Sequence, residues 1–268
     1  MLAKRTFSAV LIALIGGMMI FAGGWIYTIG IAFFLALAAW EFIHMFIQAG
    51  HQPGAVRIAA ITFVLMVLRS LNNPVYFSAG MMLAVFTVSA ANLFNFRKKK
   101  DNAAVDFAVE LATLSFIALP GSFLIQIRML PQGLFWTLVC VLCASLGDVG
   151  AYVFGSIFGR HKFSPQISPN KTIEGYVGGI IMAVLTGILL RHFFQQLHPD
   201  IHLLISVVLP ATIGIITPLG DLSKSIIKRS FSLKDTGNLI PGHGGMLDRI
   251  DTILWAAPIT FFFFQFLG

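Results

Sequence analysis

The sequence predicts an all-α, polytopic membrane protein with about nine transmembrane helices. Of its 268 residues, 57% are hydrophobic and only 11% are charged, and its mean hydropathy is +0.86. A soluble protein needs more surface charge than this composition provides. Apolar runs of bilayer length, roughly 17–25 residues, recur along the whole chain. A membrane β-barrel would instead show short segments of alternating polarity.

Each apolar run is interpreted as one spanning helix, with ends defined to within a few residues. The break at Gly23-Gly24 separates the first two runs, and merging them would reverse only the first helix. We expect N-terminal helices in 1–100, central helices with a basic cytoplasmic loop in 101–170, and C-terminal catalytic helices in 171–268. The predicted spans are 6–23, 25–48, 55–71, 75–96, 104–126, 132–158, 173–197, 201–229 and 249–267.

The distribution of Lys and Arg predicts the orientation of these helices. With a cytoplasmic N-terminus, only Arg69, Arg128 and Arg191 of the 18 Lys and Arg residues fall on the outer side. This asymmetry is the positive-inside pattern. It puts the C-terminus outside and segment 225–251 on the cytoplasmic face, where positive charge suits an anionic lipid or a nucleotide. The basic run 97–100 is interpreted as a topology anchor, with a lipid head-group site as the alternative.

Two other functional classes are not expected. No soluble basic domain is present in the sequence to bind nucleic acid. Cys140 and Cys143 have the CxxC spacing that can indicate a metal or redox site. Both lie inside an apolar run, however, and no second cysteine pair completes a zinc site. We interpret them as buried thiols that act as small apolar side chains.

Segment 225–251 concentrates acids, bases, a histidine and two adjacent glycines between two apolar runs. Ionisable residues at this depth are costly and usually functional. Within the segment, residues 241–245 form a turn in which Gly244 and Gly245 allow positive φ and the approach of backbone N–H groups to an anion. His243 could bind phosphate or a metal, or could form only a local hydrogen bond. The segment is therefore predicted to handle a metal ion and phosphate groups.

Asp148 lies inside the sixth predicted span, close to two glycines. An intramembrane carboxylate usually faces a polar cavity, and the glycines let another backbone or a ligand come close. We interpret Asp148 as functional, the alternative being a buried pair with a structural base. Glu41, near the end of the second span, is either the partner of an inner-side base or an interfacial residue without a role. Asp106 and Glu110 lie near a helix start, where the helix dipole tolerates acids.

Asp221, Ser225 and Lys228 share one helix face through their i, i+4 and i+7 spacing. A carboxylate, a hydroxyl and an ammonium that point the same way can hold a metal ion and a phosphate together. The alternative is a short i, i+3 ion pair from Asp221 to Lys224, which would contribute little.

Asp248 and Asp251 are three residues apart at the start of the last span, so they also share a face. Carboxylate oxygens are the ligands that Mg²⁺ takes, one or two of them beside substrate phosphates. Capping of the helix N-terminus is the alternative, and both roles can hold together.

Lys171 and Thr172 stand where the inner loop 159–175 runs into the seventh predicted span. The free N–H groups at a helix start attract phosphate. The pair is similar to the end of a Walker A motif, but no G-x-x-x-x-G precedes it, so this is not a P-loop.

The polar segment carries a long motif that begins S-x-hydrophobic-K-R, continues after four residues with K-D and a small residue, and closes with P-x-H-G-G-x-x-D-R-x-D. This motif resembles the signature of the phosphatidate cytidylyltransferases (CDP-diacylglycerol synthases). Segments 168–175, 148–152 and 220–222 are also similar to elements of that family. The resemblance is strong over about 145–255, whereas the N-terminal half matches only as a hydrophobic pattern. The matching motif positions are Ser225, Lys228, Arg229, Lys234, Asp235, Gly237, Pro241, His243, Gly244, Gly245, Asp248, Arg249 and Asp251.

The resemblance implies an enzyme of phospholipid biosynthesis, a nucleotidyltransferase that converts CTP and phosphatidic acid to CDP-diacylglycerol and pyrophosphate. It also implies a requirement for Mg²⁺, a response to K⁺, and an all-helical homodimer in the bilayer. Together with the charge asymmetry, it predicts a protein of the inner (plasma) membrane with its active site on the cytoplasmic side.

Roles follow from residue type and resemblance together. Asp221 and Asp248 are assigned to Mg²⁺, with Asp251 and Asp148 as further candidate ligands. The phosphates of both substrates are assigned to Lys171, Lys228, Arg229, Lys234 and Arg249. Ligand-orienting roles are assigned to Ser225, Thr172, Asn238 and His243, and the motif adds Asp235, Gly244 and Gly245 to the site.

Two other functions fit parts of the pattern. A CTP-dependent polyprenol-type lipid kinase would transfer the γ-phosphoryl group and release CDP. An ion or solute transporter would line a pathway with its acids, but it should show inverted repeats and polar residues across the membrane. The polar residues here gather at the inner face, which favours the enzyme.

Overall fold

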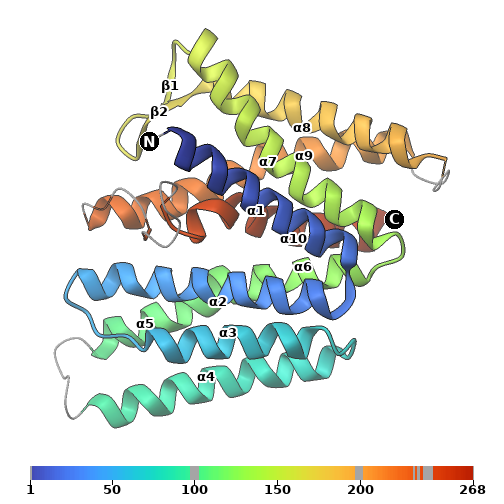
Figure 1. The fold of residues 1–268 in the computed structure, drawn as a ribbon. Coiled ribbons are helices and arrows are strands. Elements are labelled where there is room, and N and C mark those ends of the chain that lie inside the picture. Colours follow the sequence, from blue (N-terminus) through green and yellow to red (C-terminus); the bar gives the residue numbers. More distant parts are fainter. Residues whose placement is uncertain are drawn as a thin grey trace. The chain divides into compact units, whose positions relative to one another are not determined.

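The computed structural model describes residues 2–96, 103–196, 202–231, 233, 236–237 and 244–267, with side chains described from residue 11 to residue 266. Within these ranges the chain is helical except for one short β-hairpin and the connecting turns (Figure 1). The elements are α1 (Leu2–Ala22), α2 (Gly24–Gln48), α3 (Ala55–Arg69), α4 (Pro74–Phe96), α5 (Ala103–Thr113), the π-helical turn η1 (Leu114–Ala118), α6 (Leu119–Met129), α7 (Gly133–Phe158), β1 (Lys162–Ser164), β2 (Ser168–Thr172), α8 (Ile173–Phe194), α9 (Leu203–Ser230) and α10 (Leu247–Leu267).

The all-α, membrane-type fold predicted from the sequence is confirmed. Every predicted span coincides within a few residues with a helix, or with the continuous run from α5 through η1 to α6. Six helical segments among the described residues are long and apolar enough to cross a bilayer: α2, α4, the α5–α6 run, α7, α8 and α9. The crossing of all nine stays a prediction, since α3 has only 15 residues and a perpendicular span needs about 20.

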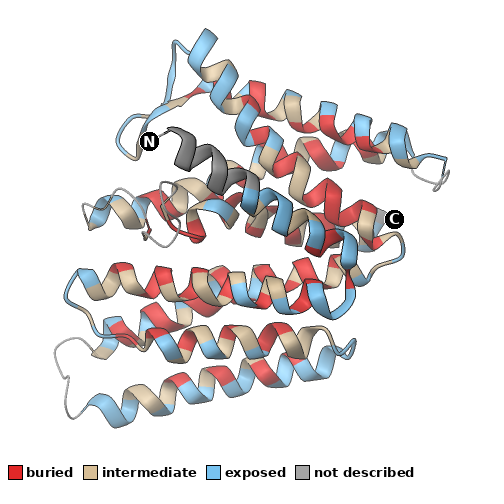
Figure 2. Cartoon of the chain, viewed as in Figure 1, coloured by how far each residue is buried: buried red, intermediate tan, exposed pale blue. Residues whose placement is uncertain are grey.

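Large apolar side chains cover much of the outer surface of the helices. Met18, Leu93, Phe94 and Leu204, for example, are strongly exposed. Figure 2 shows exposed sectors alternating with buried ones along most of the helices. A soluble monomer rarely exposes so much apolar surface, whereas lipid chains would cover it in a bilayer.

The chain divides into two compact units. The first unit comprises residues Met1–Gln126 and Ser230–Arg249, and the second comprises Ile127–Arg229 and Ile250–Gly268. In the first unit α2 packs on α3, α3 on α4, and α4 on α5, while in the second unit the main contact joins α7 and α8 (Figure 1). The three sequence regions predicted above describe order along the chain and remain a prediction.

Helix α2 forms part of the core of the first unit. Leu35, Ala38, Ala39 and Phe42 are buried along it, and the ring of Phe42 stacks on Phe116 with 5.8 Å between centroids. This packing fixes the end of α2 that carries Glu41.

Close contact between α7 and α8 organises the second unit. A Cβ placed on Gly147 would lie 3.4 Å from the carbonyl oxygen of Gly179, and one on Gly150 would lie 3.1 Å from that of Gly178. Larger side chains would therefore push the two helices apart. The prediction that the glycines near Asp148 admit another backbone is confirmed.

A buried ion-pair network in the first unit differs from the sequence interpretation of Asp106 and Glu110. Both side chains are almost completely buried. Glu110 accepts hydrogen bonds from Arg57 Nη2 at 2.5 and 2.6 Å, from Gly54 N at 2.6 Å and from Asn92 Nδ2 at 2.9 Å. Asp106 accepts one from Gln52 N at 2.9 Å. These acids therefore tie the α2–α3 loop to α5, which is a stronger reason for their position than a helix dipole.

Glu110→Gln should lower the free energy of unfolding by about 3 kcal/mol, because it leaves the Arg57 guanidinium without its charged partner. Thermal unfolding in detergent would measure the loss. The double variant Arg57→Met with Glu110→Leu should recover part of it, since it removes both charges together. A fully stable Glu110→Gln protein would contradict this account of the network.

Candidate active site

The second unit brings carboxylates and lysines together in one cluster. Lys171 Nζ lies 2.6 Å from Asp221 Oδ2, and Lys224 Nζ lies 3.3 Å from Asp221 Oδ1. Lys224 also forms an ion pair with Asp251 Oδ2, and Asp251 Oδ1 accepts the N–H of Thr252 at 2.8 Å. We call Asp148, Lys171, Asp221, Lys224 and Asp251 the acid–lysine cluster.

Four elements contribute to the acid–lysine cluster. Asp148 comes from α7, Lys171 from β2, Asp221 and Lys224 from α9, and Asp251 from the first turns of α10. The side chain of Asp148 is exposed, lies within electrostatic range of Asp221, Lys171 and Lys224, and shares a hydrogen bond with the Thr252 side chain. Residues up to 103 positions apart in the chain, from Asp148 to Asp251, therefore form one charged group.

A β-hairpin presents Lys171, in a stretch for which the sequence predicts a loop. Strands β1 and β2 pair antiparallel, with Lys162 opposite Thr172 and Ser164 opposite Ser168. Thr172 then caps α8, because its hydroxyl accepts the N–H of Gly175 at 3.1 Å. The predicted position of Lys171 and Thr172 at a helix start is confirmed, and the hairpin is a stiffer support than a loop.

A second polar group lies in the first unit around Asp248. Its Oδ2 accepts hydrogen bonds from Thr236 N at 3.0 Å and Thr236 Oγ1 at 2.9 Å, and from Gly245 N at 3.4 Å. Glu41 is fully buried and accepts the N–H groups of Met246 and Leu247, each at 2.9 Å. The start of α10 is thus held by an acid from α2.

Positive φ, which the sequence predicted for both glycines of the signature segment, occurs at Gly244, whereas Gly245 is required for lack of space. Gly244 has φ +78°, which a larger side chain rarely adopts. At Gly245 an added Cβ would collide with Thr236 Oγ1 and the Glu41 carboxylate. Only a glycine at position 245 leaves room for Glu41 to reach the backbone of α10.

For the other predicted site residues the structure gives mainly their exposure, or does not describe them. Ser225 is buried in α9, Lys228 is half-buried in its last turn, and Arg229 and Arg249 are exposed. Arg229 Nε donates to the carbonyl of Ile167 at 3.2 Å, so it contacts the hairpin that carries Lys171. Four predicted residues lie outside the described part of the chain: Lys234, Asp235, Asn238 and His243.

Sequence reasoning missed two residues of these groups. Lys224 was considered only as one end of a short ion pair with Asp221, yet it is buried and also binds Asp251. Glu41 was expected to pair with a base or to have no role, whereas it binds backbone N–H groups. Their charge on otherwise apolar helices could have indicated a role for Lys224 and Glu41, because charged residues are rarely buried without a partner.

The carboxylates of the acid–lysine cluster can hold Mg²⁺ only together with water and substrate phosphates. No group of three or more His, Cys, Asp or Glu side chains in the described part of the chain is arranged to hold a metal ion by itself. Mg²⁺ commonly takes one or two carboxylates and completes its shell with water and substrate phosphates. Asp221 and Asp251, which share Lys224 as a cationic partner, offer carboxylate oxygens of this kind.

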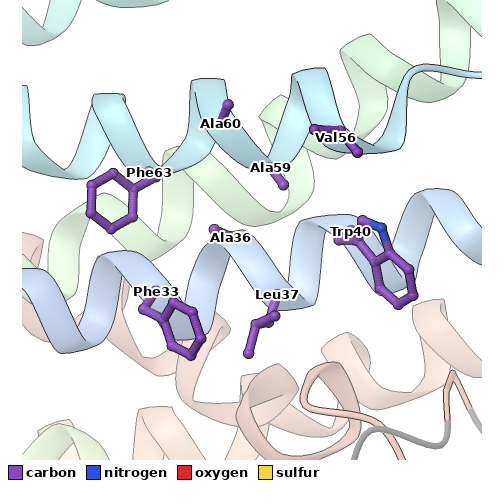
Figure 3. A pocket seen from close by; sticks show the side chains of 8 residues that line it. All are labelled: Phe33, Ala36, Leu37, Trp40, Val56, Ala59, Ala60 and Phe63. Atoms are coloured by element: carbon purple, nitrogen blue, oxygen red, sulfur yellow. The ribbon is translucent and has the colours of Figure 1, made fainter.

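An apolar groove lies elsewhere in the first unit, between α2 and α3 (Figure 3). Its volume is about 460 Å³. Small side chains such as Ala36 and Ala59 leave the space, and Phe33, Phe63 and Trp40 border it. None of the described residues that line it is an acid or a base, so they do not supply the charge that phosphate chemistry requires.

These observations define a membrane-type, predominantly helical protein whose charged side chains suit the binding of a cation and phosphates. The chain belongs to the cytidylyltransferase family, whose profile matches residues 3–267. It is 32% identical over 263 residues to the phosphatidate cytidylyltransferase of Staphylococcus epidermidis, covering 95% of this chain and 96% of that protein. The Staphylococcus haemolyticus protein of the same name is 37% identical over 180 residues, covering 67% and 64%. The one from Staphylococcus aureus is 29% identical over 264 residues, covering 95% and 96%.

Proposed function

We propose that this protein transfers the cytidylyl group of CTP to phosphatidate, producing CDP-diacylglycerol and pyrophosphate. The observation that carries the proposal is the match to the cytidylyltransferase family over residues 3–267, together with near full-length relatives named phosphatidate cytidylyltransferase. The acid–lysine cluster supports it, because nucleotidyl transfer depends mainly on positioning and on neutralising phosphate charge.

In the reaction, a phosphate oxygen of phosphatidate attacks the α-phosphorus of CTP. A new P–O bond forms there as the bond to the pyrophosphate oxygen breaks, and the electron pair leaves with pyrophosphate. The attacking phosphate is already anionic, so a strong general base is not required. Lys171 is about one-third exposed, and we assign it to a substrate phosphate, to which its ammonium can turn from Asp221.

Asp221 is the residue of the second unit that would hold Mg²⁺, with Asp251 and Asp148 as further candidate ligands. When bound, the ion neutralises phosphate charge and favours attack at phosphorus. Asp248 stays a ligand predicted from the sequence, and its hydrogen bonds with Thr236 and Gly245 hold that carboxylate in a fixed orientation. A response to K⁺ is proposed on the family resemblance alone.

Membrane geometry is part of the same proposal. We place the N-terminus and the site on the cytoplasmic side of the inner membrane, with nine spans in total, because nearly all Lys and Arg then face the cytoplasm. CTP is water-soluble, whereas phosphatidate keeps its acyl chains in the bilayer. A site at the inner interface serves both substrates. The homodimer rests on the resemblance to the family.

The test is an assay of purified protein with phosphatidate in mixed micelles and CTP labelled at either the α- or the γ-phosphorus. We expect α-label in CDP-diacylglycerol, γ-label in pyrophosphate, and less than about 1% of the activity when EDTA removes Mg²⁺. Transfer of γ-label to a lipid would instead identify a lipid kinase. Formation of CDP-diacylglycerol at the full rate in EDTA would refute the metal requirement.

A further inference from the structure

Lys224 occupies a position where lysine is rare. Its side chain is 2% exposed, and it is among the largest fully buried side chains of the described residues. Its ammonium contacts Asp221 Oδ1 at 3.3 Å and pairs with Asp251 Oδ2. A buried ammonium is stable only when opposite charge lies next to it, so Lys224 and the two aspartates depend on one another.

The two lysines of the acid–lysine cluster lie in different environments. Lys171 and its partner Asp221 are 31% and 27% exposed, whereas Lys224 and Asp251 are 2% and 7% exposed. Each lysine also uses a different oxygen of Asp221, Oδ2 for Lys171 and Oδ1 for Lys224. The outer lysine can therefore leave its carboxylate for a ligand in solution, while the inner lysine stays in place.

The difference in exposure between Lys171 and Lys224 affects the net charge of the acid–lysine cluster when a substrate binds. When all five side chains are ionised, the three carboxylates (Asp148, Asp221 and Asp251) carry one more charge than the two ammonium groups near them. When Lys171 turns to a substrate phosphate, the remaining group carries two negative charges, which one divalent cation balances. Without Lys224 it would carry three, and one divalent cation would no longer be enough.

We propose that Lys224 is a permanent cation built into the acid–lysine cluster: a positioning residue that holds Asp251 and the inner oxygen of Asp221 and leaves the outer oxygen of Asp221 to Mg²⁺ and phosphate. Only the identity of the outer ligands rests on the proposed function. The part played by Lys224 in the substrate-free protein does not.

The experiment compares thermal unfolding of wild type and Lys224→Met in detergent without substrates, first in EDTA and then in millimolar MgCl₂. Methionine is unbranched and only one non-hydrogen atom shorter than lysine, and it carries no charge. In EDTA, the unfolding midpoint of Lys224→Met should fall by about 5–15 °C, since the buried Asp251 and the partly exposed Asp221 lose the cation that they share. Mg²⁺ should bind in place of the ammonium and restore at least half of the loss, a several-fold larger shift than in wild type.

Three further variants separate charge from packing. Lys171→Met removes the other lysine on Asp221, which is 31% exposed, so its unfolding midpoint in EDTA should fall much less than that of Lys224→Met and Mg²⁺ has less stability to restore. Lys224→Arg keeps the charge and should lose less stability in EDTA than Lys224→Met. Lys224→Met with Asp251→Asn removes one charge of each sign and should be more stable in EDTA than Lys224→Met alone, even if that single variant does not fold.

Three outcomes would overturn the proposal. The first is Lys224→Met with wild-type stability in EDTA. The second is a destabilised Lys224→Met protein that Mg²⁺ does not restore, and the third is a double variant no more stable than Lys224→Met. Since these measurements contain no CTP or lipid, they can fail while the cytidylyltransferase assay succeeds, and the reverse also holds.

Discussion

Asp221→Asn should reduce the rate of CDP-diacylglycerol formation by about 10³-fold at saturating CTP and Mg²⁺. Asp221 is the carboxylate that both lysines of the cluster contact, one on each oxygen. The amide keeps the size of the side chain but provides one weaker acceptor and no charge. Lys171 would lose its resting partner, and Mg²⁺ would lose an anionic ligand.

Ser223→Ala is a suitable control for this variant. Ser223 lies two residues away in α9, is partly exposed, and donates to the carbonyl of Leu219 at 2.8 Å. It should retain nearly full activity. Both variants should fold, because Asp221 is partly exposed and Lys224 still has Asp251. An Asp221→Asn enzyme with more than a tenth of the wild-type rate would remove Asp221 from the proposed metal and phosphate site.

Residues of the candidate site could be predicted where their role shows in the sequence within a few positions. Asp221, Lys171 and Thr172 stand out as charged or polar groups at the ends of apolar runs, and the structure brings the first two together. Lys224 was not found in this way because its decisive partner, Asp251, is 27 positions further along the chain. The local i, i+3 spacing from Asp221 indicated only a short ion pair.

The fold shows the same limit. Apolar runs of bilayer length predicted the helices, since burial in lipid requires backbone hydrogen bonds to close within each segment. The β1–β2 hairpin was not predicted, because its strands have only three and five residues and one contains Pro169. The sequence also did not predict that segment 230–249 belongs to the first unit, while the residues before and after it belong to the second. It depends on Glu41 binding the backbone of Leu247, 206 positions away.

Glu41→Ala should lower the free energy of unfolding by about 2–4 kcal/mol and the turnover number by about 10²-fold. The Glu41 carboxylate is buried and accepts the N–H groups of Met246 and Leu247. Alanine would leave both donors without an acceptor. The first turn of α10 would then be less well held, and Asp248 lies in that turn. A small displacement of a catalytic segment is enough to slow a reaction that depends on positioning.

Thermal unfolding, hydrogen exchange of the first turn of α10 and steady-state kinetics would measure the three consequences. Gln48→Ala is the matched control, because Gln48 is exposed at the end of the same helix. Glu41→Gln should fall between alanine and wild type, since the amide keeps one of the two acceptor oxygens and its NH₂ group cannot accept the other N–H. If hydrogen exchange in α10 were unchanged in Glu41→Ala while activity fell, Glu41 would act on the substrates directly and not by holding the helix.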